Sequence, residues 1–207
     1  MKKINLAFVA AALLSLCTVA TAGTINIQMT GLDLSFDGST ISSLTSPDTL
    51  TSVVVSDSAG GAPTLYGTGI DVDLVVPGVT LPVASPVSSA TSAAGGSLVL
   101  NTPGGSLSLA LDPVTVTHID ATTVAFTFGA GQSSIISQSL TGFPLADPVT
   151  VSFSTTINAG TLTNDGTNVT GFTAFGTGEI TSVPEPAAGL TLLMGSLLGL
   201  VAVRRRK

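Results

Sequence analysis

The 207-residue chain has no Trp, one Cys, one His and only six Lys and Arg residues. All six cations lie at the ends of the chain, at positions 2, 3 and 204–207, so residues 23–183 carry none. Nucleic-acid binding draws most of its affinity from Lys and Arg side chains that neutralise phosphates, and phosphoryl transfer places the same side chains against the substrate. The sequence therefore argues against a nucleic-acid partner, nucleotide chemistry and adsorption to an anionic membrane surface.

Negative charge fills the span that lacks cations, because eleven of the twelve Asp and Glu residues lie in it. Carboxylates without Lys or Arg partners repel one another, and a divalent cation such as Ca²⁺, which binds oxygen ligands, would relieve the repulsion. None of these residues has the spacing of an EF-hand loop, and each also suits an ordinary turn or strand surface. With no other cofactor expected, the sequence predicts weak Ca²⁺ sites at turn and strand carboxylates, namely Asp33, Asp37, Asp71, Asp73 and Asp165.

Residues 1–22 have the pattern of a secretory signal peptide, with two Lys residues, an apolar stretch and a small-residue cleavage site. Ala20 and Ala22 fit the recognition positions of signal peptidase, so cleavage would make Gly23 the first residue of the mature protein. An uncleaved membrane anchor is the alternative. The single cysteine, Cys17, follows Leu16, where a lipoprotein signal has Gly or Ala, so we expect it to leave with the signal peptide. The mature protein would then form no disulfide.

The other end of the chain has three consecutive parts. Val183-Pro184-Glu185-Pro186 precedes 17 residues without a charge (187–203), and Arg204, Arg205, Arg206 and Lys207 follow. As a helix the uncharged stretch would be about 25 Å long, near the lower limit for crossing a bilayer. The basic cluster would stay cytoplasmic, which places the body outside. The two prolines favour an extended segment that presents Glu185 just outside the membrane.

In these residues the sequence resembles the PEP-CTERM proteins of Gram-negative bacteria, whose tail is a Pro-Glu-Pro motif, a short membrane helix and an Arg-rich cluster. The resemblance covers residues 181–207 and implies nothing about the rest of the chain. It implies recognition of Val183, Pro184, Glu185 and Pro186 by an exosortase, a membrane transpeptidase that removes the tail and passes the protein to the surface or extracellular matrix. The same tail is sometimes labelled the C-terminal domain of ice-binding proteins, which by itself shows no affinity for ice.

Between the two ends, at residues 23–180, the apolar residues alternate with polar ones and turn signals separate the runs. Ile25, Ile27 and Met29 show the pattern, as do Leu107, Leu109 and Leu111. The predicted strands lie near 24–29, 32–36, 50–55, 70–76, 79–83, 97–100, 106–111, 113–119, 122–128, 148–157 and 169–181. The pattern predicts an all-β body, a single antiparallel β-sandwich or jelly-roll-like domain. Only residues 132–140 suit a short helix, and residues 82–96 suit a long loop or, alternatively, a domain boundary.

The body offers few groups for catalysis, and we expect no catalytic residue. His118 and Asp120 lie two residues apart, which on a strand places both side chains on one face and is compatible with a hydrolase. No Ser has the Gly-x-Ser-x-Gly setting, and a partly buried strand histidine is the simpler interpretation. The Thr-rich tract 161–177 is compatible with a flat face for ice or glycan, although its spacing is not a strict alternation.

Together these patterns predict an exported, non-enzymatic protein that the C-terminal helix anchors transiently in the inner membrane before processing. Its destination would be the cell surface, the extracellular polysaccharide matrix or a biofilm. Two alternatives stay open, a Ca²⁺-dependent adhesin or glycan- or ice-binding module, and a hydrolase that uses His118 and Asp120.

Overall fold

The computed structural model describes residues 24–58, 60–83, 87–119, 125–142 and 145–182, with the backbone alone for residues 118–119 and 125–132. The described chain forms antiparallel strands and belongs to one compact unit, residues 23–185. The strands are β1 (Ile25–Phe36), β2 (Ile41–Ser43), β3 (Asp48–Thr49), β4 (Ser52–Asp57), β5 (Thr64–Tyr66), β6 (Asp71–Val76), β7 (Val87–Thr91), β8 (Gly96–Thr102), β9 (Gly105–Leu111), β10 (Val114–Ile119), β11 (Ala125–Gln138), β12 (Val149–Ile157), β13 (Thr163–Asn164) and β14 (Val169–Ser182). The prediction of an all-β, antiparallel body is confirmed.

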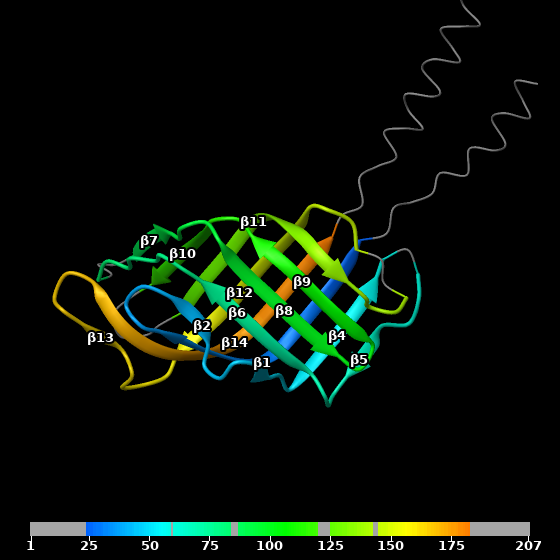
Figure 1. Ribbon diagram of the computed structural model, residues 1–207. Coiled ribbons are helices and arrows are strands. Elements are labelled where there is room, and N and C mark those ends of the chain that lie inside the picture. The colour runs from blue at the N-terminus through cyan, green and yellow to red at the C-terminus, as the bar shows by residue number, and fades with distance from the viewer. Residues whose placement is uncertain (1–23, 59, 84–86, 120–124, 143–144, 183–207) are drawn as a thin grey trace, which may run out of the picture. The chain divides into compact units, whose positions relative to one another are not determined.

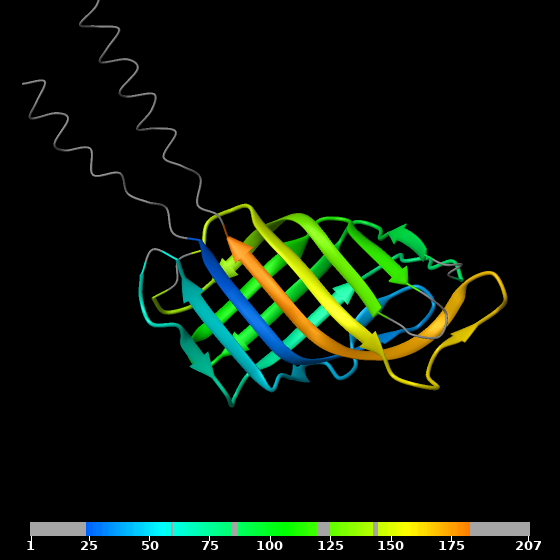
Figure 2. The ribbon, with the colours of Figure 1, turned by 180° about the vertical axis from the view of Figure 1, so that it is seen from behind.

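The strands make one sheet in the order β13-β14-β12-β11-β9-β8-β6-β2-β1-β4-β5, and β14 also pairs with β1. Strands β14 and β1 lie near opposite ends of this path, so their pairing closes the sheet on itself, and the closed sheet has two facing layers. Figures 1 and 2 show β6, β8 and β9 crossing one face, while β4, β1, β14 and β12 run in the other diagonal direction behind them. The layers are parts of one continuous sheet, which the prediction of a sandwich or jelly roll did not anticipate.

Strand β1 joins two segments that the sequence analysis separated. The apolar positions change parity after Met29, because the next buried residue is Leu32, three positions on. The extra residue at this point is Gly31, which has a φ of 78°. The register with β14 shifts here, between Thr30 and Leu32. A β-bulge of this kind lets both halves of the strand point their apolar side chains inward.

Strand β11 carries the chain from one layer to the other. Its first half pairs with β10 and β12, and its second half, from Ser134 to Gln138, pairs with β9. The short helix predicted for residues 132–140 is therefore wrong. The adjacent Ile135 and Ile136 weaken the local strand pattern, but hydrogen bonds to β9 outweigh local propensity. The Asp147 carboxylate also accepts a hydrogen bond of 2.7 Å from the Ile135 N–H.

The segment between β6 and β8 also differs from its prediction. The strand expected at 79–83 is reduced to an isolated bridge between Pro82 and Asn168, although Val79 and Leu81 are buried as its alternation required. The loop expected at 82–96 contains β7, which pairs with β10. The sequence pattern of β7 is weak because this strand pairs with β10 alone and its alternate side chains are exposed.

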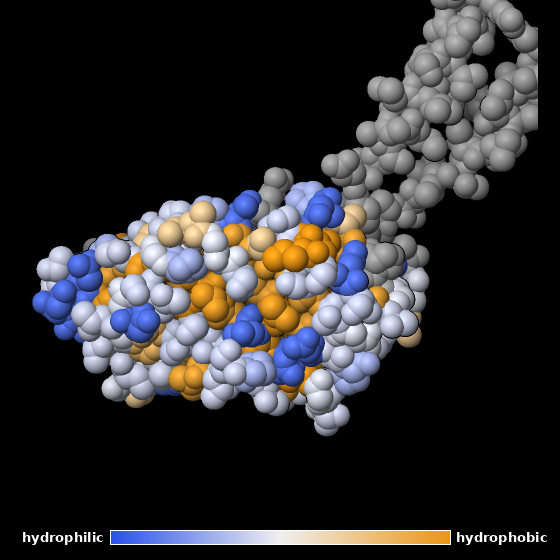
Figure 3. Space-filling model, viewed as in Figure 1, coloured by the Kyte–Doolittle hydropathy of each residue, from blue (hydrophilic) through white to orange (hydrophobic). Residues whose placement is uncertain are grey.

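The core lies between the two layers. It consists of the alternate apolar side chains that each strand points inward. Ile27, Leu34, Leu74, Leu100 and Leu109 are fully buried in it. Each such side chain contributes about 1.5–3 kcal/mol relative to an exposed one. The alternation predicted for β1, β9 and β12 is confirmed by the buried positions in these strands. The outer face of the β6–β8–β9 layer mixes apolar and polar patches (Figure 3).

Candidate functional site

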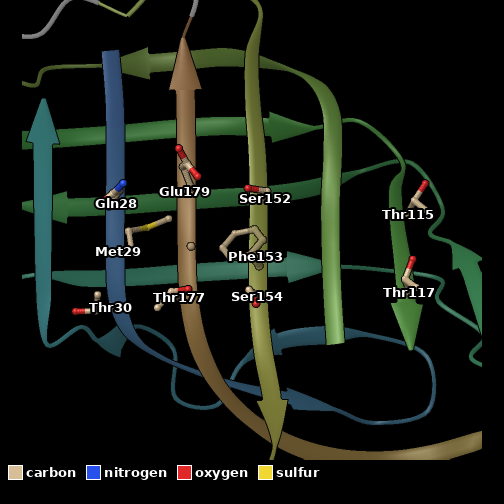
Figure 4. Close-up of a pocket in the computed structure, with 11 residues that line it drawn as sticks. Gln28, Met29, Thr30, Thr115, Thr117, Ser152, Phe153, Ser154, Thr177 and Glu179 are labelled. Atoms are coloured by element: carbon tan, nitrogen blue, oxygen red, sulfur yellow. The ribbon is translucent and has the colours of Figure 1, made fainter. Parts of the chain in front are cut away.

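A pocket of about 570 Å³ lies on the outer face of the layer that β1, β14, β12, β11 and β10 form (Figure 4). It is open to solvent, because Gln28, Thr115, Ser152, Ser154 and Thr177 in its lining are exposed. The complete lining is Gln28, Met29, Thr30, Thr115, Thr117, Ser152, Phe153, Ser154, Thr177, Gly178 and Glu179. Six of these eleven residues are Ser or Thr, so hydroxyl groups dominate its chemistry.

Strand register aligns Ser and Thr residues in one row across the pocket. Thr30 pairs with Ser52 of β4 and with Thr177 of β14, and Thr177 pairs with Ser154 of β12. Residue 127 of β11, a Thr, continues the row to Thr117 of β10. Residues directly opposite in antiparallel strands lie on the same face of the sheet. We call these six positions, 52, 30, 177, 154, 127 and 117, the hydroxyl row.

A second row lies two residues further along the strands. Gln28 pairs with Glu179, Glu179 with Ser152, and residue 129 of β11 stands between Ser152 and Thr115. Residue 129 is a Gly, so this position has no side chain between its two neighbours. The pocket is hollow at its centre because the residues there are small. The longer side chains of Gln28 and Glu179 stand at one side of it.

Glu179 is the single ionisable side chain in the pocket lining. Its Oε1 accepts a hydrogen bond from the Asn26 amide and another, of 3.4 Å, from the Thr181 hydroxyl. The Asn26 Oδ1 is buried and has no hydrogen-bond partner among the described residues. The pocket therefore combines one anchored carboxylate with hydroxyl and amide groups, a set that suits hydrogen bonding to a polar ligand without a negative charge.

Most hydroxyls of the pocket have no partner within the described chain. Thr30 and Ser52 bond to each other at 2.7 Å between their oxygens. The side chains of Ser154, Thr177 and Thr117 make no hydrogen bond to a described residue, and the same holds for Ser152 and Thr115. Such hydroxyls bind water or a ligand, each with one donor and two acceptor positions.

In the Thr-rich tract 161–177, which the sequence left open as a flat face for ice or glycan, most hydroxyls form hydrogen bonds within the chain. Thr161 donates to the carbonyls of Asn158 and Thr173, and Thr163 donates to the Gly171 carbonyl while accepting from Thr170. These hydroxyls stabilise the chain's own turns. The hydroxyl-rich surface instead forms across strands, and Thr177 is the one member of that tract that joins the hydroxyl row.

Two of the predicted Ca²⁺ ligands, Asp37 and Asp165, each use one carboxylate oxygen to accept hydrogen bonds within their own turns. Asp37 accepts hydrogen bonds from the backbone N–H groups of Thr40 and Ser39, which lower the pKa of its carboxyl below the ordinary value. Asp165 accepts from the backbone N–H groups of Asn168 and Thr167, and these bonds lower the pKa of Asp165 in the same way. Both residues act as turn-stabilising acceptors.

The other three predicted ligands lie on strands. Asp71 and Asp73 share the outer face of β6, and Asp71 accepts a hydrogen bond of 2.7 Å from the Asn101 amide. Burial, and next repulsion from Asp48, raise the pKa of Asp33, whose N–H donates to the Asp48 carboxylate. The described residues contain no group of three or more Asp, Glu, His or Cys side chains placed to hold a metal ion.

Calcium binding can be tested through stability at Asp33 and Asp48, because repulsion from the Asp48 carboxylate contributes to the raised pKa of Asp33. If Ca²⁺ bridges this pair, millimolar Ca²⁺ raises the melting temperature by about 2–5 °C relative to chelator. Asp33→Asn removes the repulsion and is expected to abolish most of the response. Melting curves that coincide in Ca²⁺ and in chelator would eliminate the hypothesis.

Several predicted residues lie outside the described part of the chain. The backbone of His118 pairs with residues 88 and 126, but its side chain and all of Asp120 lie outside that part. The same holds for Ala20, Ala22, Gly23, the motif Val183 to Pro186, the expected helix at 187–203 and the basic cluster 204–207. In the described ranges, no helix has the length and apolar character that a membrane crossing requires.

Comparison with protein families identifies the C-terminal end. Residues 182–207 match the PEP-CTERM protein-sorting motif. The chain carries a PEP-CTERM tail. This tail implies processing by an exosortase, a membrane enzyme, and sorting to the cell surface. Neither a curated protein nor a solved structure matches the chain. The PEP-CTERM match covers the tail alone, and the β body is interpreted from its own geometry.

Proposed function

We propose that this PEP-CTERM protein is a non-enzymatic component of the extracellular polysaccharide matrix or biofilm. The sorting tail delivers the β body outward, and signal peptidase and an exosortase remove its two ends. The observation that carries the proposal is the joint presence of the tail at residues 182–207 and the hydroxyl-lined pocket on the body. A matrix polysaccharide is the polymer that such a pocket meets outside the cell.

The chemistry of the pocket supports a binding role over a hydrolytic one. Glycoside hydrolysis generally uses two carboxyl groups on either side of the scissile bond. Glu179 is the one carboxylate among the residues that line this pocket, and Asn26 and Thr181 hold one of its oxygens. Such an anchored acid suits ligand positioning by hydrogen bonds.

Location in the matrix tests the proposal. Matrix extracted from surface-grown cells is separated by size, and the protein is followed with an antibody to the β body. We expect it to co-fractionate with the polysaccharide and to become soluble in a mutant that makes no polysaccharide. A strain without the exosortase serves as the control and is expected to hold the protein in the inner membrane. Protein that stays free in the medium whether or not polysaccharide is made would contradict the proposal.

A further inference from the structure

The hydroxyl row has the dimensions of a binding track for an extended polymer. Its six positions lie on six adjacent strands, from Ser52 of β4 to Thr117 of β10. Adjacent strands are about 4.8 Å apart, so the row is about 24 Å long, and the sequence has a Ser or Thr at each of its six positions. This spacing is close to the length of one sugar ring in an extended polysaccharide, so successive rings would meet successive hydroxyls.

The charge of the surface selects against acidic polymers. Residues 23–183 contain no Lys or Arg, and the pocket contains the Glu179 carboxylate. A uronate or sulfate group bound here would lose hydration and gain no counter-charge. A neutral sugar, in contrast, donates hydroxyls to Glu179 and Gln28 and exchanges hydrogen bonds with Ser154 and Thr177.

An exposed aromatic ring lies beside the row. Phe175 precedes Thr177 by two residues on β14, so both side chains are on the outer face and their attachment points are about 7 Å apart. The Phe175 side chain is 52% exposed, which is unusual for so large an apolar group on a strand. Its register neighbours are Asp33 and Thr156. The ring is available to cover the apolar C–H face of a sugar whose hydroxyls bond to the row.

We propose that the pocket and hydroxyl row bind a neutral polysaccharide chain that runs across the strands, with Phe175 stacked against one sugar ring. This inference rests on the proposed function, because it names the class of polymer that retains the protein in the matrix. The hydroxyls fix the chain's direction, and Phe175 supplies apolar contact area.

Binding by purified mature protein tests the proposal. The protein recovered from the producing cells is applied to an array of neutral glucans, mannans and galactans beside alginate and hyaluronate. We expect retention on neutral chains alone and about tenfold weaker binding for Phe175→Ala, since the variant loses most of the apolar contact. The double variant Ser154→Ala, Thr177→Val should also bind at least about tenfold more weakly, because it loses two hydroxyl contacts.

Two matched variants control for surface changes elsewhere. Leu65→Ala shortens another exposed apolar side chain on β5, and Ser108→Ala removes a hydroxyl from β9 in the other layer. Both should bind like the natural protein, and circular dichroism should show that all variants are folded.

Several results would overturn the inference. They are the absence of binding to every neutral polysaccharide, equal binding to alginate, and unchanged binding by the Phe175 and Ser154–Thr177 variants. Suppression of ice growth without glycan binding would also overturn it. If the protein fractionates with the matrix but binds no neutral glycan, this inference fails and the proposed function stands. If it never reaches the matrix, the proposed function itself fails.

Discussion

Gly176→Val is expected to destabilise the β body by more than about 3 kcal/mol, which would lower its melting temperature by about 10 °C or prevent folding. Gly176 lies on β14 where the strand packs against β12. A Cβ atom there would overlap the Ser154 carbonyl oxygen and lie 2.7 Å from the Thr155 Cα. Both are backbone atoms of a paired strand, so the clash can be relieved only by separating β12 from β14.

The matched control is Gly67→Val, because a Cβ atom at Gly67 would have no neighbour within 4 Å. Thermal unfolding followed by circular dichroism compares the two variants, and Gly176→Ala gives an intermediate case if the valine variant does not fold. A Gly176→Val protein that melts with the natural one would show that β12 and β14 do not pack as closely as described.

Replacing Pro184, Glu185 and Pro186 together by Ala is expected to abolish tail removal. From the sequence we expect the prolines to favour an extended conformation here, and alanines would allow the helix expected at 187–203 to continue through it. Exosortase would then meet a helix in place of an extended segment with an acid at its centre. Immunoblots of cell fractions should show a larger protein in the inner membrane and little in the matrix.

The control for the motif variant is the natural chain in a strain without exosortase, which should give the same size and location. Combining the variant with the strain should add no further effect. If the variant is processed and released like the natural protein, the Pro-Glu-Pro element does not act as the recognition signal.

The sequence predicted the strand content well where one face of a strand is buried. In β9 and β12 every second residue is inside, and the periodicity is visible without knowledge of any neighbour. The prediction was wrong where neighbours decide the structure. The helix expected at residues 132–140 is the second half of β11, whose partner β9 begins at residue 105. No local pattern reports that pairing.

The candidate site was even harder to predict from the sequence than the strands. Ser52, Thr30, Thr177, Ser154 and Thr117 are far apart in the chain, and only the register of five strand pairs makes them neighbours. The local sequence pattern pointed instead to the tract 161–177, whose hydroxyls mostly bond within their own turns. The sequence holds one signal for the site that was not recognised, because Phe175 has the parity of the polar positions of β14. The tail, in contrast, is a contiguous motif and was found directly.

The intact mass of the protein recovered from the extracellular matrix tests the central claim most directly. That claim is that both ends are removed while the anionic β body is delivered outside. Mass spectrometry is expected to show a chain that begins at Gly23 and ends near Pro184, without the membrane segment and basic cluster. A matrix protein that retains residues 187–207, or a full-length chain found in the cytoplasm, would contradict the account.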